Sequence, residues 1–322
     1  MKRYLVAVIL GVPALFINGV SMAETYPSRP VSVIVPVTPA GNVDIVARTV
    51  SEQLTTILGQ TFVVNNRPGA SGIVGLSYVA NATPDGYTIT AAPAAFIATN
   101  PSMFKSLPYD STKDFAPIVN VATTPRILVV RASSKYKTVM DVVEDARRNP
   151  GKLNFGSAGD GTPHHLSGVL FAERADLELV HIPYKGGAPA TNDLLAGHID
   201  MMFAAVPESK PFIDAGQLRA LGITSSQRAA VLPDVPTMAE SGLEGMELSA
   251  WVGLLGPADM PQDAIDRINK AVNEALQGDL GKRYASMGYD SVGGSPEHFR
   301  SLIKSEVKMY ADLIQAAGIK PQ

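Results

Sequence analysis

Cysteine is absent from the 322-residue chain, and aromatic residues make up only 7% of it. Without cysteine there is no disulfide bond, thiolate metal site, thiol nucleophile or acylated N-terminal cysteine. Neither sign of charge is in excess, because 27 basic and 30 acidic residues give a formal net charge of −3. A basic surface for nucleic acid is therefore not predicted, and no nucleic-acid partner is expected.

A long hydrophobic run occurs once, at the N-terminus. Two basic residues precede an apolar stretch from Tyr4 to Val20, which ends in the small-residue sequence Ser21-Met22-Ala23. The stretch is shorter than the roughly 20 residues of a bilayer span, and Pro13 interrupts it. We interpret residues 1–23 as a secretory signal peptide that is cleaved after Ala23, which predicts a mature protein in the periplasm.

The rest of the chain alternates short β-rich runs with helical patterns. Strands are expected at 31–37, 61–66, 87–92, 126–132, 153–158, 177–183, 199–206, 218–225 and 247–257. Helices are expected at 42–58, 72–82, 163–172, 262–277 and 296–316. This alternation predicts an α/β fold with parallel sheets of βαβ units.

Two of these segments, near 121–127 and 248–254, are interpreted as crossings between two lobes. They bracket a series of strands and helices that would form a lobe inserted into the first one. The predicted division is residues 24–122 with 252–322 for lobe 1 and 123–251 for lobe 2.

Two turns rich in small residues each lead from a predicted strand into a helix. Their sequences are PVTPAGNVD (36–44) and GSAGDGTPHH (156–165). Such turns present free backbone N–H groups and the positive end of a helix dipole, so they can bind an anion without a lysine. The first is equally compatible with an ordinary turn whose helix is capped by Asn42 or Asp44. Facing each other across a cleft, the two turns would hold a carboxylate.

Metal, cofactor and catalytic motifs are weak. The five histidines form no metal-ligand motif: they are His164, His165, His181, His198 and His298. No cofactor or metal is expected. The sequence around Ser157 departs from a nucleophile elbow, because Phe155 occupies the position of its first glycine. A hydrolase or isomerase that uses His165, Asp44 or Ser157 is the alternative, since these residues could converge on one cleft.

A third turn, Tyr184 to Gly187, follows another predicted strand and leads into a helix. Its Lys185 is either a solvated loop residue or part of a cleft wall. The sequence leaves both interpretations open.

In this order along the chain, the turns and strands resemble the receptors of tripartite tricarboxylate transporters, the Bug-type solute-binding proteins. The resemblance covers essentially all of the chain after residue 23. The segments that carry it are PVTPAGNVDIVAR (36–48), VVNNRPGASGIVG (63–75), PDGYTI (84–89), DFAPIVNVA (114–122), GSAGDGTPHHLSGVLF (156–171), HIPYKGGAPATNDLLAGHIDMMF (181–203), GQLRALGITSSQR (216–228), LPDVPTMAESG (232–242) and WVGLLGPADMP (251–261).

The resemblance implies a two-lobed α/β fold of the periplasmic binding-protein kind, type II-like, with a ligand cleft between the lobes. Its expected ligand is a small carboxylate, and its expected partner is the membrane permease of the transporter. A sensor kinase is the alternative partner. The residues expected to contact the ligand are Thr38, Ala40, Gly41, Asn42, Asp44, Ala94 and Ala95 in lobe 1, and Ser157, Gly159, Gly161, Thr162, His165, Tyr184, Gly187 and Ala205 in lobe 2.

Three positions depart from the family pattern in ways that bear on the cleft. Val37 replaces the usual phenylalanine, and Ala40 replaces a glycine. Arg126 stands near a predicted crossing, where a small or amide residue is more usual. Its guanidinium could bind a second carboxylate bidentately or form an ion pair at the hinge, and the sequence leaves both open. We count Arg126 among the candidate ligand-binding residues.

Overall fold

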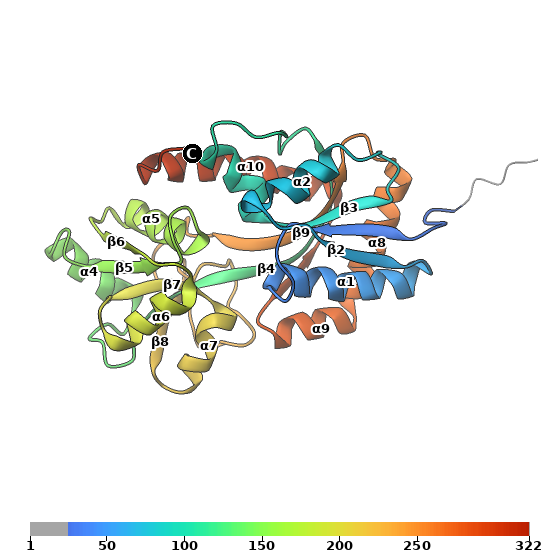
Figure 1. The fold of residues 1–322 in the computed structure, drawn as a ribbon. Coiled ribbons are helices and arrows are strands. Elements are labelled where there is room, and N and C mark those ends of the chain that lie inside the picture. Colours follow the sequence, from blue (N-terminus) through green and yellow to red (C-terminus); the bar gives the residue numbers. More distant parts are fainter. Residues whose placement is uncertain (1–24, 322) are drawn as a thin grey trace, which may run out of the picture.

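The computed structural model describes residues 25–321 and shows two α/β lobes joined by long strands (Figure 1). The predicted signal peptide, residues 1–23, lies outside the described residues. Within residues 25–321, no helix combines the length and the apolar character needed to cross a membrane.

The first lobe is built on a mostly buried sheet. Its strands are β1 (Val31–Val35), β2 (Phe62–Asn66), β3 (Thr88–Pro93), the first part of β4 (Phe115–Arg131), β9 (Ser249–Pro257) and β10 (Asp290–Gly293). The order is β2-β1-β3-β9-β4, with β10 on the free side of β4. Strand β1 pairs in parallel with β2 and β3, whereas β9 is antiparallel to both β3 and β4.

Helices cover both faces of this first sheet. One face packs against α1 (Asn42–Leu58), α8 (Gln262–Gln277) and α9 (Asp279–Ser286). The other face is covered by α2 (Ile73–Ala80), the π-helical turn η2 (Ala95–Thr99) and α10 (Pro296–Ala316), while the short η1 (Ala70–Gly72) and α3 (Asn100–Met103) flank these elements.

The second lobe repeats this arrangement. Its strands are the last part of β4 with β5 (Asn154–Ser157), β6 (Val180–Pro183), β7 (Met201–Ala205) and β8 (Leu218–Ile223), in the order β8-β4-β7-β5-β6. Helices α4 (Val139–Arg148) and α5 (Pro163–Ala175) cover one face, and α6 (Gly187–Ala196) and α7 (Val206–Asp214) the other. The C-terminal end of α10 also packs on the α4 and α5 side.

Strand β4 connects the lobes, because its 17 residues belong to both sheets. Pro125 pairs with Ser249 of β9, and the next residue, Arg126, pairs with Ala205 of β7. The prediction of a strand only from residue 126 onward was wrong. The strand begins at Phe115, and its ladder with β9 is interrupted by register shifts that begin at Pro117 and Asn120. The residue numbers predicted to divide the lobes stay a prediction.

The long helices form where the sequence has an amphipathic pattern of apolar residues. In α1, Val46, Val50 and Leu54 are buried on one face, and Gly59 ends the helix at φ +73°. Glycine adopts this left-handed backbone conformation without the steric penalty that other residues incur. The sequence analysis did not predict α4, α7, α9 and β10.

Candidate functional site

The first turn lies between β1 and α1 and is open to solvent. Thr38, Ala40, Gly41 and Asn42 are all exposed. Gly41 is the N-cap of α1 in an extended conformation, and no side chain accepts a hydrogen bond there. Of the two alternatives that the sequence left open, the one in which Asn42 or Asp44 caps the helix is therefore not observed. The first N–H groups of α1 have no side-chain acceptor among the described residues, so they can serve an anion.

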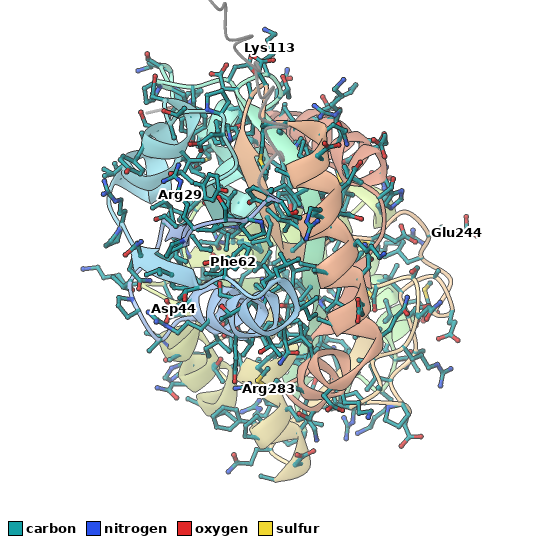
Figure 2. The ribbon with its side chains drawn as sticks, turned by 90° about the vertical axis from the view of Figure 1, so that its right-hand side faces the viewer. Arg29, Asp44, Phe62, Lys113, Glu244 and Arg283 are labelled. Atoms are coloured by element: carbon teal, nitrogen blue, oxygen red, sulfur yellow. The ribbon has the colours of Figure 1, made fainter. Side chains whose placement is uncertain are left out.

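Asp44, labelled in Figure 2, is turned back into the protein instead. Its Oδ2 accepts hydrogen bonds from the Ala40 backbone N–H at 2.9 Å and from Arg48 Nε at 2.8 Å. Its Oδ1 accepts one from the Asn66 amide at 2.8 Å. Burial alone would raise the pKa of Asp44, but the hydrogen bonds from Arg48, Ala40 and Asn66 hold that pKa below its ordinary value. Both carboxylate oxygens are thus occupied, and Asp44 fixes the shape of the turn.

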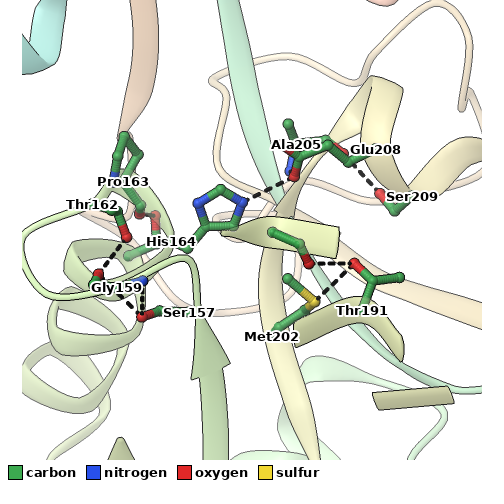
Figure 3. Close-up of polar contacts among 12 residues, drawn as sticks. Ser157, Gly159, Thr162, Pro163, His164, Thr191, Met202, Ala205, Glu208 and Ser209 are labelled. Carbon is green, nitrogen blue, oxygen red and sulfur yellow. Dashed lines mark hydrogen bonds and ion pairs between the residues drawn. The ribbon is translucent and has the colours of Figure 1, made fainter. Parts of the chain in front are cut away.

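The second turn, between β5 and α5, is held by its own polar groups (Figure 3). Ser157 is fully buried, and its Oγ accepts a hydrogen bond from the Gly159 N–H at 3.1 Å. Thr162 Oγ1 donates to the Gly159 carbonyl at 2.6 Å, and the Gly161 N–H donates to His165 Nδ1 at 3.1 Å. Gly159 and Gly161 have φ of +120° and +69°. The glycines permit this tight turn, which places the start of α5 at the end of β5.

Two histidines form a stacked wall behind this turn. The rings of His165 and His181 lie 3.7 Å apart and 6° from parallel, and Phe155 stacks on His181 at 5.0 Å. Burial and the neighbouring His181, against the opposing effect of Asp160, lower the pKa of His165 to about 4. Burial also lowers the pKa of His181, again against Asp160. Both imidazoles are therefore neutral at neutral pH.

The wall could not be foreseen by treating His181 as an isolated histidine. Strand β6 pairs in parallel with β5 so that His181 is the register partner of Phe155. The adjacency of the two rings therefore depends on strand register, which the sequence pattern did not specify.

Asp160, His165 and His181 have potential ligand atoms within 4.8 Å of one another. The parallel rings do not suit a shared ion, because a metal in the plane of one ring lies outside the plane of the other, and the Gly161 N–H already occupies His165 Nδ1. Ser157 Oγ lies 2.6 Å from His181 Nε2, and His181 Nδ1 lies 3.5 Å from Asp160. This connectivity is like a serine–histidine–aspartate relay, but Ser157 is 0% exposed and cannot reach a substrate.

The carboxylate of Glu208 lies in the first turn of α7. His164 Nε2 donates to Glu208 Oε2 at 2.9 Å, and the Ala205 N–H donates to the same oxygen at 3.2 Å (Figure 3). Burial would raise the pKa of Glu208, but His164, the charge of Arg126 and the Ala205 N–H hold it below its ordinary value. The predicted contact residue Ala205 thus has its N–H engaged by Glu208, a contact that was not foreseen because α7 itself was not predicted.

The remaining predicted residues surround the space between the lobes. A cavity of about 240 Å³ is lined by Ala95 and Met103 from the first lobe and by Gly161 and Thr162 from the second. Ala94 is buried at the end of β3, next to Ala95.

The third turn lies at the end of β6. The Tyr184 hydroxyl donates to Asp193 at 2.7 Å, so this tyrosine is tied to α6. Gly187 starts α6, and a Cβ there would lie 3.3 Å from Glu208. Lys185 is exposed, as its loop interpretation expects.

Arg126 lies where β4 passes from one lobe to the other. Only 6% of the residue is exposed, and burial lowers the pKa of its guanidinium. Within residues 25–321 no acidic side chain lies within ion-pair distance of it. The carboxylate of Glu208 is the charge that acts on it most strongly.

Similar proteins agree with this architecture. A family model described as the tripartite tricarboxylate transporter family receptor matches residues 46–319. BugT of Bordetella pertussis is 33% identical over 322 residues, covering 99% of this chain and 99% of BugT. A protein of R. palustris solved with adipate is 34% identical, with a TM-score of 0.76, over 92% of this chain and 100% of its own.

MatC of Rhodopseudomonas palustris, solved with bound malate, is 29% identical with a TM-score of 0.71, over 90% of this chain and 100% of its own. The similarity to BugT spans both lobes and the turns described above, whereas the family-model match begins after the first turn. The chain belongs to the tripartite tricarboxylate transporter receptor family, whose Bug-type members are periplasmic solute-binding proteins.

Proposed function

We propose that this protein binds a small organic mono- or dicarboxylate between its lobes, without transforming it, and delivers it to the permease of a tripartite tricarboxylate-type transporter. The observation that carries the proposal is the first turn, where α1 begins at Gly41 with no side-chain cap. Gly41 and Asn42 are exposed, so an anion can reach the N–H groups at this helix start. The adipate and malate named for two similar structures support a carboxylate as the ligand.

The proposed binding mode uses backbone donors from both lobes. The turn after β1 supplies N–H groups at Gly41 and Asn42, and the turn after β5 supplies the start of α5 near Thr162. A hydrogen bond to a charged group contributes about 1.5 to 3 kcal/mol, so several of them with bridging waters suffice for micromolar affinity, about −8 kcal/mol. Closing the lobes brings the two sets of donors together on one ligand.

A periplasmic hydrolase or isomerase is the competing function. It would need Ser157, His165 or Asp44 as a reacting group, yet Ser157 is buried and Asp44 is saturated by internal hydrogen bonds. The geometry therefore favours a receptor. Mass spectrometry of a bound carboxylate after prolonged incubation with the protein would detect turnover, and any product would contradict the receptor proposal.

The central experiment is a thermal-shift screen of ligand-stripped protein against aliphatic and aromatic carboxylates, followed by calorimetry. A ligand at 100 times its dissociation constant stabilises the folded state by about 2.7 kcal/mol. We expect at least one carboxylate to raise the melting temperature. Stabilisation by sugars or cationic solutes alone would refute the proposal.

Delivery and export are tested separately. We propose the permease as the partner, and no comparison supports a sensor kinase. Deleting the permease genes should abolish uptake of the carboxylate while leaving binding by the purified receptor intact. N-terminal sequencing of the exported protein should begin at Glu24 if the signal peptide is cleaved as predicted.

A further inference from the structure

Arg126 occupies a position at the hinge that few side chains could share. Its backbone is fixed on both sides: the N–H donates to Thr224 Oγ1 at 2.9 Å, and the residue is the register partner of Ala205. Along a strand, alternate residues face the same side. Arg126 therefore shares its side with Leu128, which packs in the core that contains Tyr310 of α10.

The guanidinium at this position lacks the partners that buried arginines usually have. Its Nε is buried without a hydrogen-bond partner, and its side chain makes no hydrogen bond to any residue in the described part of the chain. For comparison, the half-buried Arg219 and the exposed Arg147 both donate to backbone carbonyls. A buried charge that is neither paired nor hydrogen-bonded lowers stability, so such a group needs a functional explanation.

Glu208 does not satisfy Arg126. No ion pair joins the two groups within 4 Å, so the carboxylate lies farther than that from the guanidinium. The Glu208 carboxylate accepts hydrogen bonds from His164 and from the Ala205 N–H instead. Among the surrounding charges, that of Glu208 nevertheless has the largest effect on the pKa of Arg126. The two groups thus lie near each other without direct contact.

A purely structural role for Arg126 fits these observations poorly. A hinge ion pair, the alternative that the sequence left open, would show a carboxylate within about 4 Å, as Arg48 shows with Asp44 at 2.8 Å. An apolar residue of similar volume would pack against Tyr310 without the loss of hydration. A buried guanidinium without a partner instead fits a binding site for an anion.

We propose that Arg126 binds the second carboxylate of a dicarboxylate whose first carboxylate is held by the two helix-start turns. This inference rests on the proposed function and narrows its ligand class. The planar guanidinium can hold a carboxylate through two parallel N–H donors, which an ammonium group cannot reproduce.

The test compares each diacid with a ligand of the same length that has one carboxylate. The probes are malate, succinate, adipate and suberate, together with the monoamides of the last three, measured by calorimetry on wild type, Arg126→Met and Arg126→Lys. The wild type should prefer at least one diacid over its monoamide by at least tenfold, about 1.4 kcal/mol. Arg126→Met should bind that diacid as weakly as the monoamide, and Arg126→Lys should retain part of the preference.

Arg219→Met is the matched control, because Arg219 lies in the same lobe and donates to the carbonyls of Ser134 and Tyr136. It should leave the diacid preference unchanged. Equal binding of every diacid and its monoamide by wild type would overturn the inference while the proposed function stands. Equal weakening of both ligands in Arg126→Met would also overturn it, since that pattern indicates a structural role.

Folding is followed independently by circular dichroism. If Arg126→Met does not fold, the wild-type ratio and Arg126→Lys still decide the question: a wild-type preference that survives unchanged in the lysine variant contradicts a bidentate site. Absence of binding to any carboxylate by wild type would refute the proposed function itself, and the inference with it.

Discussion

Glu306→Gln should change the pH dependence of stability in a defined direction. Glu306 is 7% exposed on α10, and its Oε2 accepts a hydrogen bond from Trp251 Nε1 at 2.6 Å. Burial raises its pKa from 4.5 to about 7, although the Trp251 hydrogen bond opposes the rise. Glutamine keeps an acceptor for Trp251 and removes the ionisation.

The sign and size follow from where the proton is bound. Between pH 4.5 and about 7, the folded protein retains a proton on Glu306 that the unfolded chain has released. Stability therefore falls as pH rises through this interval, and the interval corresponds to about 3 kcal/mol, as an order of magnitude. Below pH 4.5 both states are protonated, so Glu306 no longer makes stability depend on pH and the stability that is lost at higher pH is fully present.

His165 acts in the opposite direction over nearly the same interval. Burial and His181, against Asp160, lower its pKa from 6.5 to about 4, so the unfolded chain takes up a proton first as the pH falls. The stability that His165 contributes is therefore lost as pH falls from 6.5 towards 4. In the wild type, the opposite effects of Glu306 and His165 on the free energy of unfolding nearly cancel as the pH changes. Without the ionisation of Glu306, the pH dependence that His165 causes should become visible.

The assay is urea unfolding at half-unit steps from pH 4.5 to 8, followed by circular dichroism and by the fluorescence of Trp251, the only tryptophan. The free energy of unfolding of Glu306→Gln minus that of wild type should rise by about 3 kcal/mol across this range. The exposed Glu274, on α8, gives the matched control Glu274→Gln, which should show no such rise. A difference between Glu306→Gln and wild type that does not vary with pH would refute the reasoning.

Three further predictions concern the turns. Ala40→Gly should raise the free energy of unfolding by about 1 kcal/mol, measured in urea, because Ala40 has φ +68°; no gain would mean that the turn carries no strain. Gly161→Val should weaken carboxylate binding in calorimetry more than Thr162→Ala does. The reason is that Gly161 has φ +69° and that a Cβ there would lie 2.8 Å from Met103. Wild-type affinity in the valine variant would contradict binding through the turn backbone. In the Glu306→Gln background, His165→Asn should flatten the loss of stability as the pH falls from 6.5 to 4.5 in the same unfolding assay, because the pKa of about 4 belongs to that ring; an unchanged slope would assign the effect elsewhere.

Local patterns were enough to predict much of the fold. The helices at 42–58, 262–277 and 296–316 were predicted with the bounds that the structure shows, because each carries an amphipathic stripe between clear start and stop residues. The turns after β1 and β5 were also found from local composition. Strand β4 was predicted at less than half its length, because burial on both faces removes the alternation that marks a strand and Pro117 interrupts the run.

The parts of the site that depend on distant residues were not predictable in this way. His181 joins His165 only through the register of β5 and β6. Glu208 meets His164 only because α5 and α7 start at the same edge of the second sheet. Asp44 was expected at the ligand or as a helix cap. Hydrogen bonds from Arg48, one helical turn further along α1, and from Asn66 at the end of β2 draw it inward instead.

The central place of β9 in the first sheet bears on how the chain is assembled. Every strand of the second sheet lies between residues 115 and 223, whereas β9, residues 249–257, must enter between β3 and β4 to complete the first. The second lobe can thus form while the first still exposes the edge of β3, with Ile89, Ala91 and Ala92 uncovered. Such an edge pairs readily with other chains. Newly exported protein that lacks its last 70 or so residues should therefore be prone to aggregation and depend on chaperones, although it carries every strand of the second sheet.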